Sequence, residues 1–442
     1  NSLSLIKLFE KNLPPVLVGS FRGWVNLKKG KFEDSLLEFK KLSETDLKFD
    51  LGSYYSAIAY AQKDFNEEAL KIINLNNMNF SVLGKVFEIF RSEVFAMNGK
   101  NGQAQTTLKK LINEFLNDVT LKELYRKIQK SKFNDYNIFK NENNGISDTL
   151  LLFAQGESRQ INQKLVEIFY CQLAYYLSRN NTRFKLRLAK ALDEVELFKK
   201  AKAILESIPE TDIFYLESRL ILADLLYENK KNVEAKNVLN SLIETKTDIF
   251  EIYELLGNIY RYNEEFDLAE ASYAKAIGLI QNEEFDNQNL WLMYFFRGIT
   301  LEQLKNYESS KQNLRKSLSL MPDQPQVLNY LGYMLIEQKE NLNEALEMIR
   351  KAVKISPQSG YIIDSLAWGL YQLGRYSEAI EPMEKAIELE PEDPIINDHL
   401  GDILWKIGRK REAYFQWKKA LLFNPKEELK LEIEKKINFG LQ

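Results

Sequence analysis

The chain has 442 residues, with 60 basic and 63 acidic side chains and a formal net charge of -3. It lacks the excess of Lys and Arg that phosphate neutralisation requires, which argues against a nucleic-acid partner. Cys171 is the only cysteine, so an internal disulfide is excluded. No run of 18 apolar residues occurs, and the chain as given is not expected to span a membrane.

Residues 1–116 carry three weak copies of one pattern, from which we predict N-terminal helix pairs. In each copy a small residue is followed 12 positions later by a second small residue and 16 positions later by a bulky one. A small side chain permits close approach where two helices cross. The copies are Gly23, Ser35 and Phe39; Ala57, Ala69 and Ile73; and Ser92, Ala104 and Leu108.

Residues 117–160 interrupt this pattern, and asparagine is frequent there, at positions 134, 137, 141, 143 and 144. We expect an irregular connection in this region. One interpretation is a surface loop or an irregular helical pair. The other is a hinge between an N-terminal and a C-terminal group of repeats.

The pattern returns in residues 161–288, where three central units are predicted. The first small residues of these units, Ala189, Ala223 and Gly257, lie 34 positions apart. The remaining positions of the three units are Ala201 and Leu205; Ala235 and Leu239; and Ala269, Tyr273 and Ala276.

Residues 289–424 repeat most regularly, and three columns share a period of 34. The columns are Ala345, Ala379 and Ala413; Ala352, Ala386 and Ala420; and Pro357, Pro391 and Pro425. A further unit contains Gly298, Ser310 and Leu314. The prolines are expected to follow the second helix of each unit, and Gly374 and Gly408 to close the first helix in a left-handed conformation. Residues 425–442 form a charged amphipathic segment, interpreted as a capping helix.

This period is typical of the tetratricopeptide repeat, a helix-turn-helix unit. So is the order of residues within each unit, which is a small residue, an Ala, a bulky residue, a second Ala and a Pro. The predicted fold is therefore all-α, a right-handed superhelix of about ten antiparallel helix pairs. Such solenoids bind other molecules on a curved inner surface, which favours a binding protein over a catalyst.

Few residues are suited to catalysis. His399 is the only histidine, so a Ser-His or Cys-His relay and the usual zinc sites lack the necessary parts. His399 is interpreted as a structural or groove-lining residue. No glycine-rich phosphate loop is present. We therefore expect neither enzymatic activity nor a cofactor or metal ion.

The first helix of a tetratricopeptide unit lines the concave side, and positions three or four apart share one face. Aromatic side chains dominate the energetics of protein interfaces, so a groove rich in them is expected to bind a protein or peptide. The alternative is that some of these rings pack between repeats as core. The predicted partner-binding residues are Phe295, Phe296, Tyr330, Tyr333, Tyr361, Trp368, Tyr371, His399, Asp402 and Trp405.

Some tetratricopeptide proteins hold a partner's terminal carboxylate with Lys, Arg and Asn on this face. Here the corresponding positions are Asp364, Ser365, Asp398 and His399. That carboxylate clamp is absent. A basic or neutral hydrophobic segment therefore suits the predicted groove better than an acidic one.

From about Leu328 onwards, the chain resembles the C-terminal signature of proteobacterial tetratricopeptide proteins of the cell envelope. The segments that carry the resemblance are IIDSLAWGLYQLGRYSEAIEPMEKAIELEP and DPIINDHLGDILWKIGRKREAYFQWKKAL. Ala367 stands in place of an expected Gly. The closing KKINFGL is similar to the alphaproteobacterial members. That family includes outer-membrane lipoproteins that bind a carboxy-terminal processing protease and deliver its substrates. The resemblance implies a periplasmic location. Because the sequence begins at Asn1, any export signal or lipid-acceptor cysteine is expected outside it.

Three functional hypotheses follow. The favoured one is a non-catalytic adaptor that recruits partner proteins through the aromatic groove and delivers substrates to an envelope protease. The second is a structural scaffold or assembly subunit whose aromatic face is permanently filled. The third, an enzyme with unrecognised carboxylate chemistry, would require turnover by the isolated chain.

Overall fold

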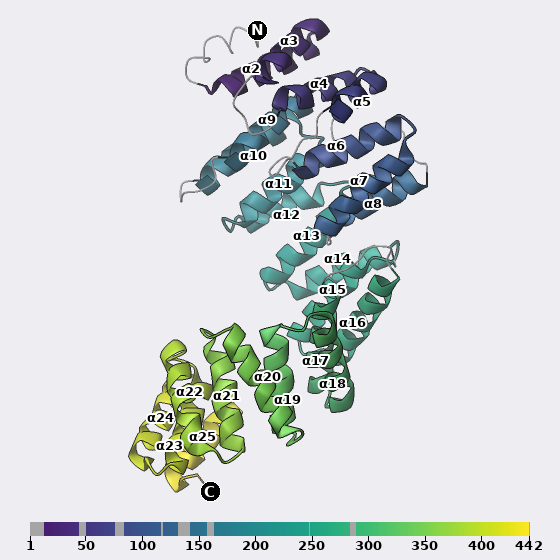
Figure 1. Cartoon of the computed structure of the whole chain (residues 1–442). Coiled ribbons are helices and arrows are strands. Elements are labelled where there is room, and N and C mark those ends of the chain that lie inside the picture. Colours follow the sequence, from purple (N-terminus) through teal and green to yellow (C-terminus); the bar gives the residue numbers. More distant parts are fainter. Residues whose placement is uncertain are drawn as a thin grey trace. The chain divides into compact units, whose positions relative to one another are not determined.

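The computed structural model describes residues 13–43, 50–75, 84–115, 118–130, 142–156, 163–246, 248–282 and 289–441. Over these residues the chain forms 24 α-helices and no strand (Figure 1). The helices belong to two compact units. Unit 1 comprises Asn1–Ile259 and Gly278–Asn287, and unit 2 comprises Tyr260–Ile277 and Gln288–Gln442. The predicted all-α fold class is confirmed.

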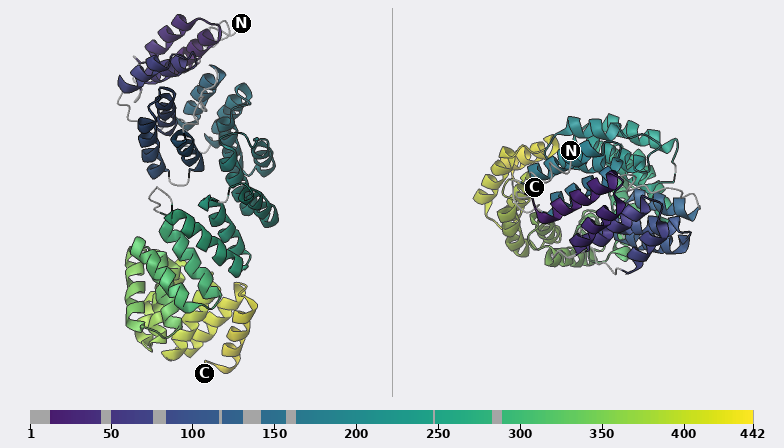
Figure 2. Two further views of the ribbon diagram at one scale, coloured as in Figure 1. Left: turned by 90° about the vertical axis from the view of Figure 1, so that its right-hand side faces the viewer. Right: turned by 90° about the horizontal axis from the view of Figure 1, so that it is seen from above.

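Successive helices in unit 1 pack mainly as pairs, and Figure 2 shows the same pairing from two further directions. α8 contacts α7, which precedes it, and α9 and α10 contact each other. The helices are α2 (Pro15–Lys28), α3 (Phe32–Ser43), α4 (Leu51–Ala61), α5 (Asn66–Leu75), α6 (Gly84–Met97), α7 (Asn101–Glu114), α8 (Val119–Gln129), α9 (Glu142–Gly156), α10 (Gln163–Leu177), α11 (Thr182–Asp193), α12 (Phe198–Glu206), α13 (Tyr215–Glu228) and α14 (Asn232–Ile243).

α15 (Phe250–Tyr262) and α16 (Phe266–Gln281) contain the boundary between the two units. Four regular pairs and one final helix follow in unit 2. They are α17 (Leu290–Gln303) with α18 (Tyr307–Leu320), α19 (Pro325–Glu337) with α20 (Leu342–Ile355), α21 (Gly360–Gln372) with α22 (Tyr376–Leu389), α23 (Pro394–Lys406) with α24 (Lys410–Leu422), and α25 (Glu427–Phe439).

One backbone conformation recurs between the two helices of ten pairs. After Gly374, at φ +72°, the amide of Arg375 donates to the carbonyl of Leu370 at 2.9 Å, which closes α21. The predicted left-handed conformation of Gly374 and Gly408 is confirmed. The left-handed residues of the ten turns are Gly30, Asp64, Gly99, Glu196, Lys230, Glu264, Lys305, Lys339, Gly374 and Gly408.

The small-residue columns lie where the two helices of a pair meet. A Cβ on Gly332 would lie 2.8 Å from the carbonyl oxygen of Ala345, and one on Gly401 would lie 2.4 Å from the ring of Trp417. Ala379 is completely buried. These positions are small because any larger side chain would push the helix axes apart.

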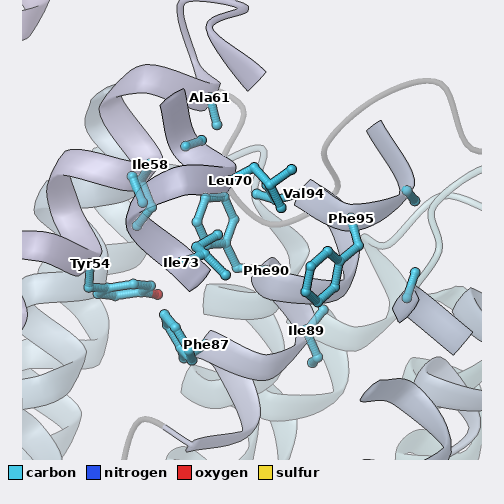
Figure 3. Close-up of a cluster of buried hydrophobic side chains, with 14 of the residues drawn as sticks. Tyr54, Ile58, Ala61, Leu70, Ile73, Phe87, Ile89, Phe90, Val94 and Phe95 are labelled. Carbon is cyan, nitrogen blue, oxygen red and sulfur yellow. The ribbon is translucent and has the colours of Figure 1, made fainter. Parts of the chain in front are cut away.

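Large apolar side chains fill the spaces between neighbouring pairs. In unit 1, Figure 3 shows Tyr54 and Ile58 of α4 facing Phe87 and Phe90 of α6, with Ile73 of α5 beside them. All five are at most 1% exposed. Burial of this apolar surface, about 25 cal/mol per Å², is the main force that holds successive pairs together.

The region expected to be an irregular connection contains α8 and the start of the α9/α10 pair. α9 packs on first helices of the N-terminal pairs: Gly145 abuts the ring of Trp24 on α2, and Thr149 is 2.7 Å from the hydroxyl of Tyr55 on α4. Positions 134, 137 and 141 lie outside the described residues. The domain boundaries at 116, 160, 288 and 424 stay a prediction.

α8 is held by polar contacts to the central helices. Lys122 on α8 forms a buried ion pair with Glu251 on α15 at 2.8 Å, and its ammonium lies 4.3 Å from the ring centroid of Phe250. Thr120 donates to Glu217 on α13 at 2.7 Å. None of the described helices is long and apolar enough to cross a membrane.

Candidate functional site

Hydrogen bonds join consecutive first helices along one face of unit 2. In each case a carboxylate on one first helix pairs with a ring or an ammonium on the next. We call this surface of α17, α19, α21, α23 and α25 the ladder face, defined by Glu302, Tyr330, Glu337, Tyr361, Asp364, Trp368, Asp398, His399, Asp402 and Lys436. Tyr361 belongs to it because it lies one helical turn before Asp364 and two before Trp368 on α21.

The first pairs of the ladder face use ring donors. The hydroxyl of Tyr330 donates to Glu302 Oε2 at 3.1 Å, and the indole nitrogen of Trp368 donates to Glu337 Oε1 at 3.0 Å. Each bond crosses from one repeat to the next. The aromatic residues of this face therefore form part of its surface and also fix the position of each first helix relative to the next.

The last pairs are buried and charged. Lys436 of α25 donates to both carboxylate oxygens of Asp398, at 2.9 and 2.7 Å, and to Asp402 Oδ2 at 2.8 Å. The other oxygen of Asp402 accepts the indole proton of Trp417 at 2.9 Å. Both carboxylates are thus fully engaged by the chain itself, and α25 is tied to the inner helix of the last pair.

Three rings stack beside these carboxylates. Trp368 lies 4.7 Å from Tyr371 at an interplanar angle of 11°, and 3.9 Å from His399 at 14°. Nδ1 of His399 is 2.9 Å from Asp364 Oδ1. Nearly parallel stacking and the hydrogen bond together fix the orientation of the imidazole.

A second group of rings occupies α17 and its neighbours. Phe295 meets the edge of Tyr330 at 6.0 Å, and Phe296 stacks on Tyr273 of α16 at 6.0 Å. The guanidinium of Arg261 lies 4.9 Å from the ring centroid of Phe296. A cation in this position is attracted to the electron-rich face of the ring.

The carboxylates give the ladder face a negative local potential. Burial raises the pKa of the Tyr330 hydroxyl, and Glu302 raises it further. Burial and then Glu337 raise the pKa of Tyr333, while burial and then Asp402 raise that of Tyr371. All three phenols therefore stay protonated, and that of Tyr330 donates to Glu302.

Burial also perturbs the two titrating groups of α23. Burial, followed by the neighbouring charge of Asp402, raises the pKa of Asp398 to about 6 against the opposing effect of Lys436. For His399, burial lowers the pKa, but Asp364, Asp398 and Asp402 together outweigh it and the net shift is upward. The imidazole is therefore stabilised in its charged form.

The ten predicted contact residues differ in exposure. Tyr361 is 56% exposed, whereas His399 and Asp402 are 8% and 3% exposed. Trp405 packs against Trp417 at 5.4 Å and against Gly440, where a Cβ would lie 2.4 Å from its ring. The half-buried members of the set are Phe295, Phe296, Tyr330, Tyr333, Trp368, Tyr371 and Trp405. Their contact with a partner stays a prediction.

Sequence reasoning missed Glu302, Glu337 and Lys436 as members of this face. The sequence did indicate that the two glutamates lie near the face of the small residues. They follow Gly298 and Gly332 by four and five positions, about one helical turn. Lys436 carried no such signal, since its segment was interpreted only as a cap.

Among the described residues, no group of three or more His, Cys, Asp or Glu side chains is placed to hold a metal ion. A cavity of about 870 Å³ lies in unit 1, lined by polar residues from the turns before α11 and α13. Two of them, Thr182 and Asp212, are hydrogen bonded to each other at 2.6 Å. None of the ten predicted contact residues lines this cavity.

Four segments match family models of repeats. Residues 250–283, 293–324 and 326–359 match the tetratricopeptide repeat, and residues 370–408 match a second model described as a TPR repeat. No curated protein sequence matches the chain.

Three solved structures illustrate the likeness in fold. The APC/C hetero-tetramer Cut9–Hcn1 has 14% identity and a TM-score of 0.47, with 99% of this chain and 92% of that chain covered. A tetratricopeptide repeat protein from Parabacteroides merdae has 19% identity and a TM-score of 0.47, with 57% and 97% covered. YrrB, a TPR protein described as having an unusual peptide-binding site, has 19% identity and a TM-score of 0.34, with 45% and 97% covered.

Proposed function

We propose that this tetratricopeptide repeat protein is a non-catalytic adaptor that binds a segment of another protein on the ladder face of unit 2. Tetratricopeptide repeats generally mediate protein–protein interaction and scaffolding. In this chain, the ladder face of unit 2 is the surface that we propose for this interaction.

The observation that carries the proposal is a contrast between the two units. In unit 1 the aromatic residues of the first helices, Trp24, Tyr54 and Tyr55, are at most 1% exposed, and α9 contacts them. In unit 2, Tyr361 is 56% exposed, and Trp368 is only half-buried although its indole nitrogen is hydrogen bonded. The chain fills one aromatic face with its own helix and leaves rings on the other accessible.

Aromatic residues with polar edges suit this role. Tyr and Trp contribute large contact areas at a low cost in conformational entropy, and they are enriched among residues that dominate binding. The hydrogen bonds to Glu302 and Glu337 restrain Tyr330 and Trp368 before any partner arrives. Such preorganisation reduces the entropic cost of association.

The test is affinity capture from the source organism with the double variant Tyr361→Ala and Trp368→Ala. We expect it to lose the partners that the wild type retains, because two central contact surfaces are removed. Phe415→Ala, at a 67% exposed position on α24, should retain them. Tyr361→Ala alone supplies a variant without loss of internal packing. The proposal fails if a correctly folded double variant captures the same partners as the wild type.

The finer part of the proposal is the identity and location of the partners. By resemblance of the last quarter of the chain, we propose a processing protease of the bacterial cell envelope and its substrates, met on the periplasmic side. A protease among the proteins lost from the double-variant eluate would support this. Capture of cytosolic proteins alone would contradict it while leaving the adaptor role intact.

The second candidate function, a structural scaffold or assembly subunit, is favoured by a different surface. α10 exposes a stripe of apolar side chains: Leu165 is 68% exposed, Phe169 56% and Tyr176 65%. Exposed apolar stripes of this kind often mark permanent contacts. Size-exclusion chromatography with light scattering separates the two functions, because a free monomer favours the adaptor and an obligate oligomer favours the scaffold.

A further inference from the structure

Resting on the proposed function, we further propose that the occupant of the ladder face is a basic peptide segment. One of its Lys or Arg side chains binds Glu337, between the rings of Tyr333 and Trp368. A positively charged side chain of the partner would therefore contact both α19 and α21.

The ladder face is rich in acidic side chains. Five carboxylates lie along the first helices of unit 2, and the pKa values of Tyr330, Tyr333 and Tyr371 are all raised in part by them. A negative surface attracts a basic segment and repels an acidic one, because like charges brought together at an interface are unfavourable. The carboxylates are Glu302, Glu337, Asp364, Asp398 and Asp402.

The chain itself already places a cation on this face. Lys436 extends from α25 to Asp398 and Asp402 with three contacts between 2.7 and 2.9 Å. The neighbouring rings are Trp417, which donates to Asp402, and Tyr371, whose pKa responds to both aspartates. A lysine between carboxylates and aromatic rings is thus an arrangement that these repeats accommodate.

The surroundings of Glu337 suit the binding of a cation. Its carboxylate accepts a hydrogen bond from the indole of Trp368 at 3.0 Å, and its charge contributes to the raised pKa of Tyr333, one helical turn earlier on α19. Glu337 is exposed, and an ionised carboxylate can accept about four hydrogen bonds, so acceptor positions remain for a further donor. A guanidinium or ammonium would bind there by charge-assisted hydrogen bonds beside two aromatic rings.

Glu337 is the exposed member of the five carboxylates: Glu302 is half-buried, and the three aspartates are buried. Asp398 and Asp402 are 4% and 3% exposed and occupied by Lys436, and Asp364 is 7% exposed and paired with His399. Glu337 therefore combines negative charge, fixed orientation and access. We assign it as the residue that selects for positive charge in the partner.

The experiment is selection of a phage-displayed library of random 12-residue peptides on the intact chain. The wild type is compared with Glu337→Gln, which retains an oxygen that can accept from Trp368 but loses the charge. Glu347→Gln, at an exposed position on α20, is the matched control. The Tyr361→Ala and Trp368→Ala double variant identifies peptides that bind the ladder face. Circular dichroism verifies the fold of each variant.

We expect the wild type and Glu347→Gln to enrich peptides rich in Lys and Arg that the double variant does not bind. Glu337→Gln should bind the same synthetic peptides about tenfold more weakly, and raising the salt concentration should narrow this difference. Binding that requires Tyr361 and Trp368 but shows no preference for basic residues, or no effect of Glu337→Gln, overturns this inference and leaves the adaptor function standing. Selected peptides that bind the double variant as well as the wild type would count against both proposals.

Discussion

Single buried charges in unit 1 have measurable consequences for stability. Burial, and then the like charge of Glu251, raise the pKa of Glu254 on α15 to about 7, although Lys122 opposes the shift. Glu251 itself is neutralised by Lys122 at 2.8 Å. Ionisation of Glu254 is therefore unfavourable in the folded chain.

Glu254→Gln should stabilise the chain at alkaline pH. The folded pKa of about 7 lies above the unfolded value of about 4.5, so the favourable contribution of protonated Glu254 is complete below pH 4.5 and is lost as the pH rises through 7. We expect the free energy of unfolding to increase by up to about 3 kcal/mol at pH 8, and by little at pH 4.5. Thermal melts at both pH values measure this, with exposed Glu210→Gln as control. A substitution that destabilises equally at both pH values would refute the burial argument.

Sequence reasoning was most successful for residues whose role depends on size or backbone conformation. Gly374 and Gly408 adopt positive φ angles, and the column of Ala379 is buried, as the repeat predicted. The partners of Glu337 and Lys436 could not be predicted in the same way. Long side chains can reach several neighbours, and the sequence does not specify which rotamer brings two of them together.

At the scale of the helix, α25 is both a cover and part of the ladder face. Its Ile433 is completely buried against the last pair, and Lys436 forms ion pairs with two carboxylates of α23. Removing one partner from a buried ion pair leaves the other charge uncompensated. The packing of α25 on the last pair should therefore depend on Lys436 more than on the exposed charges of α25.

We expect Lys436→Met to destabilise unit 2 by about 3 kcal/mol at pH 8. Asp398 has a folded pKa of about 6, above its unfolded value of 3.8, so it is largely protonated at pH 5 and the loss of Lys436 should cost less there. Tryptophan fluorescence during unfolding is a suitable readout, because four of the five tryptophans lie in unit 2. The neighbouring exposed Lys435→Met should have almost no effect. An equal loss at pH 5 and pH 8 would contradict the proposed pairing.

The helices that the repeat pattern did not predict are α10 and, in the interrupted region, α8 and α9. The contacts of α8 and α9 involve Lys122 with Glu251 and Gly145 with Trp24, side chains that do not belong to the periodic columns. A helix that packs on the first helices of other pairs need not repeat their spacing. The loss of register in residues 117–160 consequently marked a change in packing partner for α8 and α9.

At the scale of the whole molecule, the sequence predicted ten repeat units, and ten pairs share the left-handed turn. The number of units could be predicted because a period of 34 residues constrains every unit in the same way. The partner could not be predicted with the same certainty, because binding depends on the few side chains that vary between units. The aromatic and acidic residues of α17, α19, α21 and α23 are such positions.

The central claim is that another protein binds the ladder face of unit 2. It is tested most directly by placing a photo-cross-linking amino acid at Tyr361 and, as control, at Phe415, both exposed positions, in the organism that produces the chain. We expect a discrete cross-linked partner from position 361 and none of the same mass from position 415. Cross-links to that partner from position 415 alone, or no cross-link at 361 in cells where the partner co-purifies with the chain, would contradict the claim.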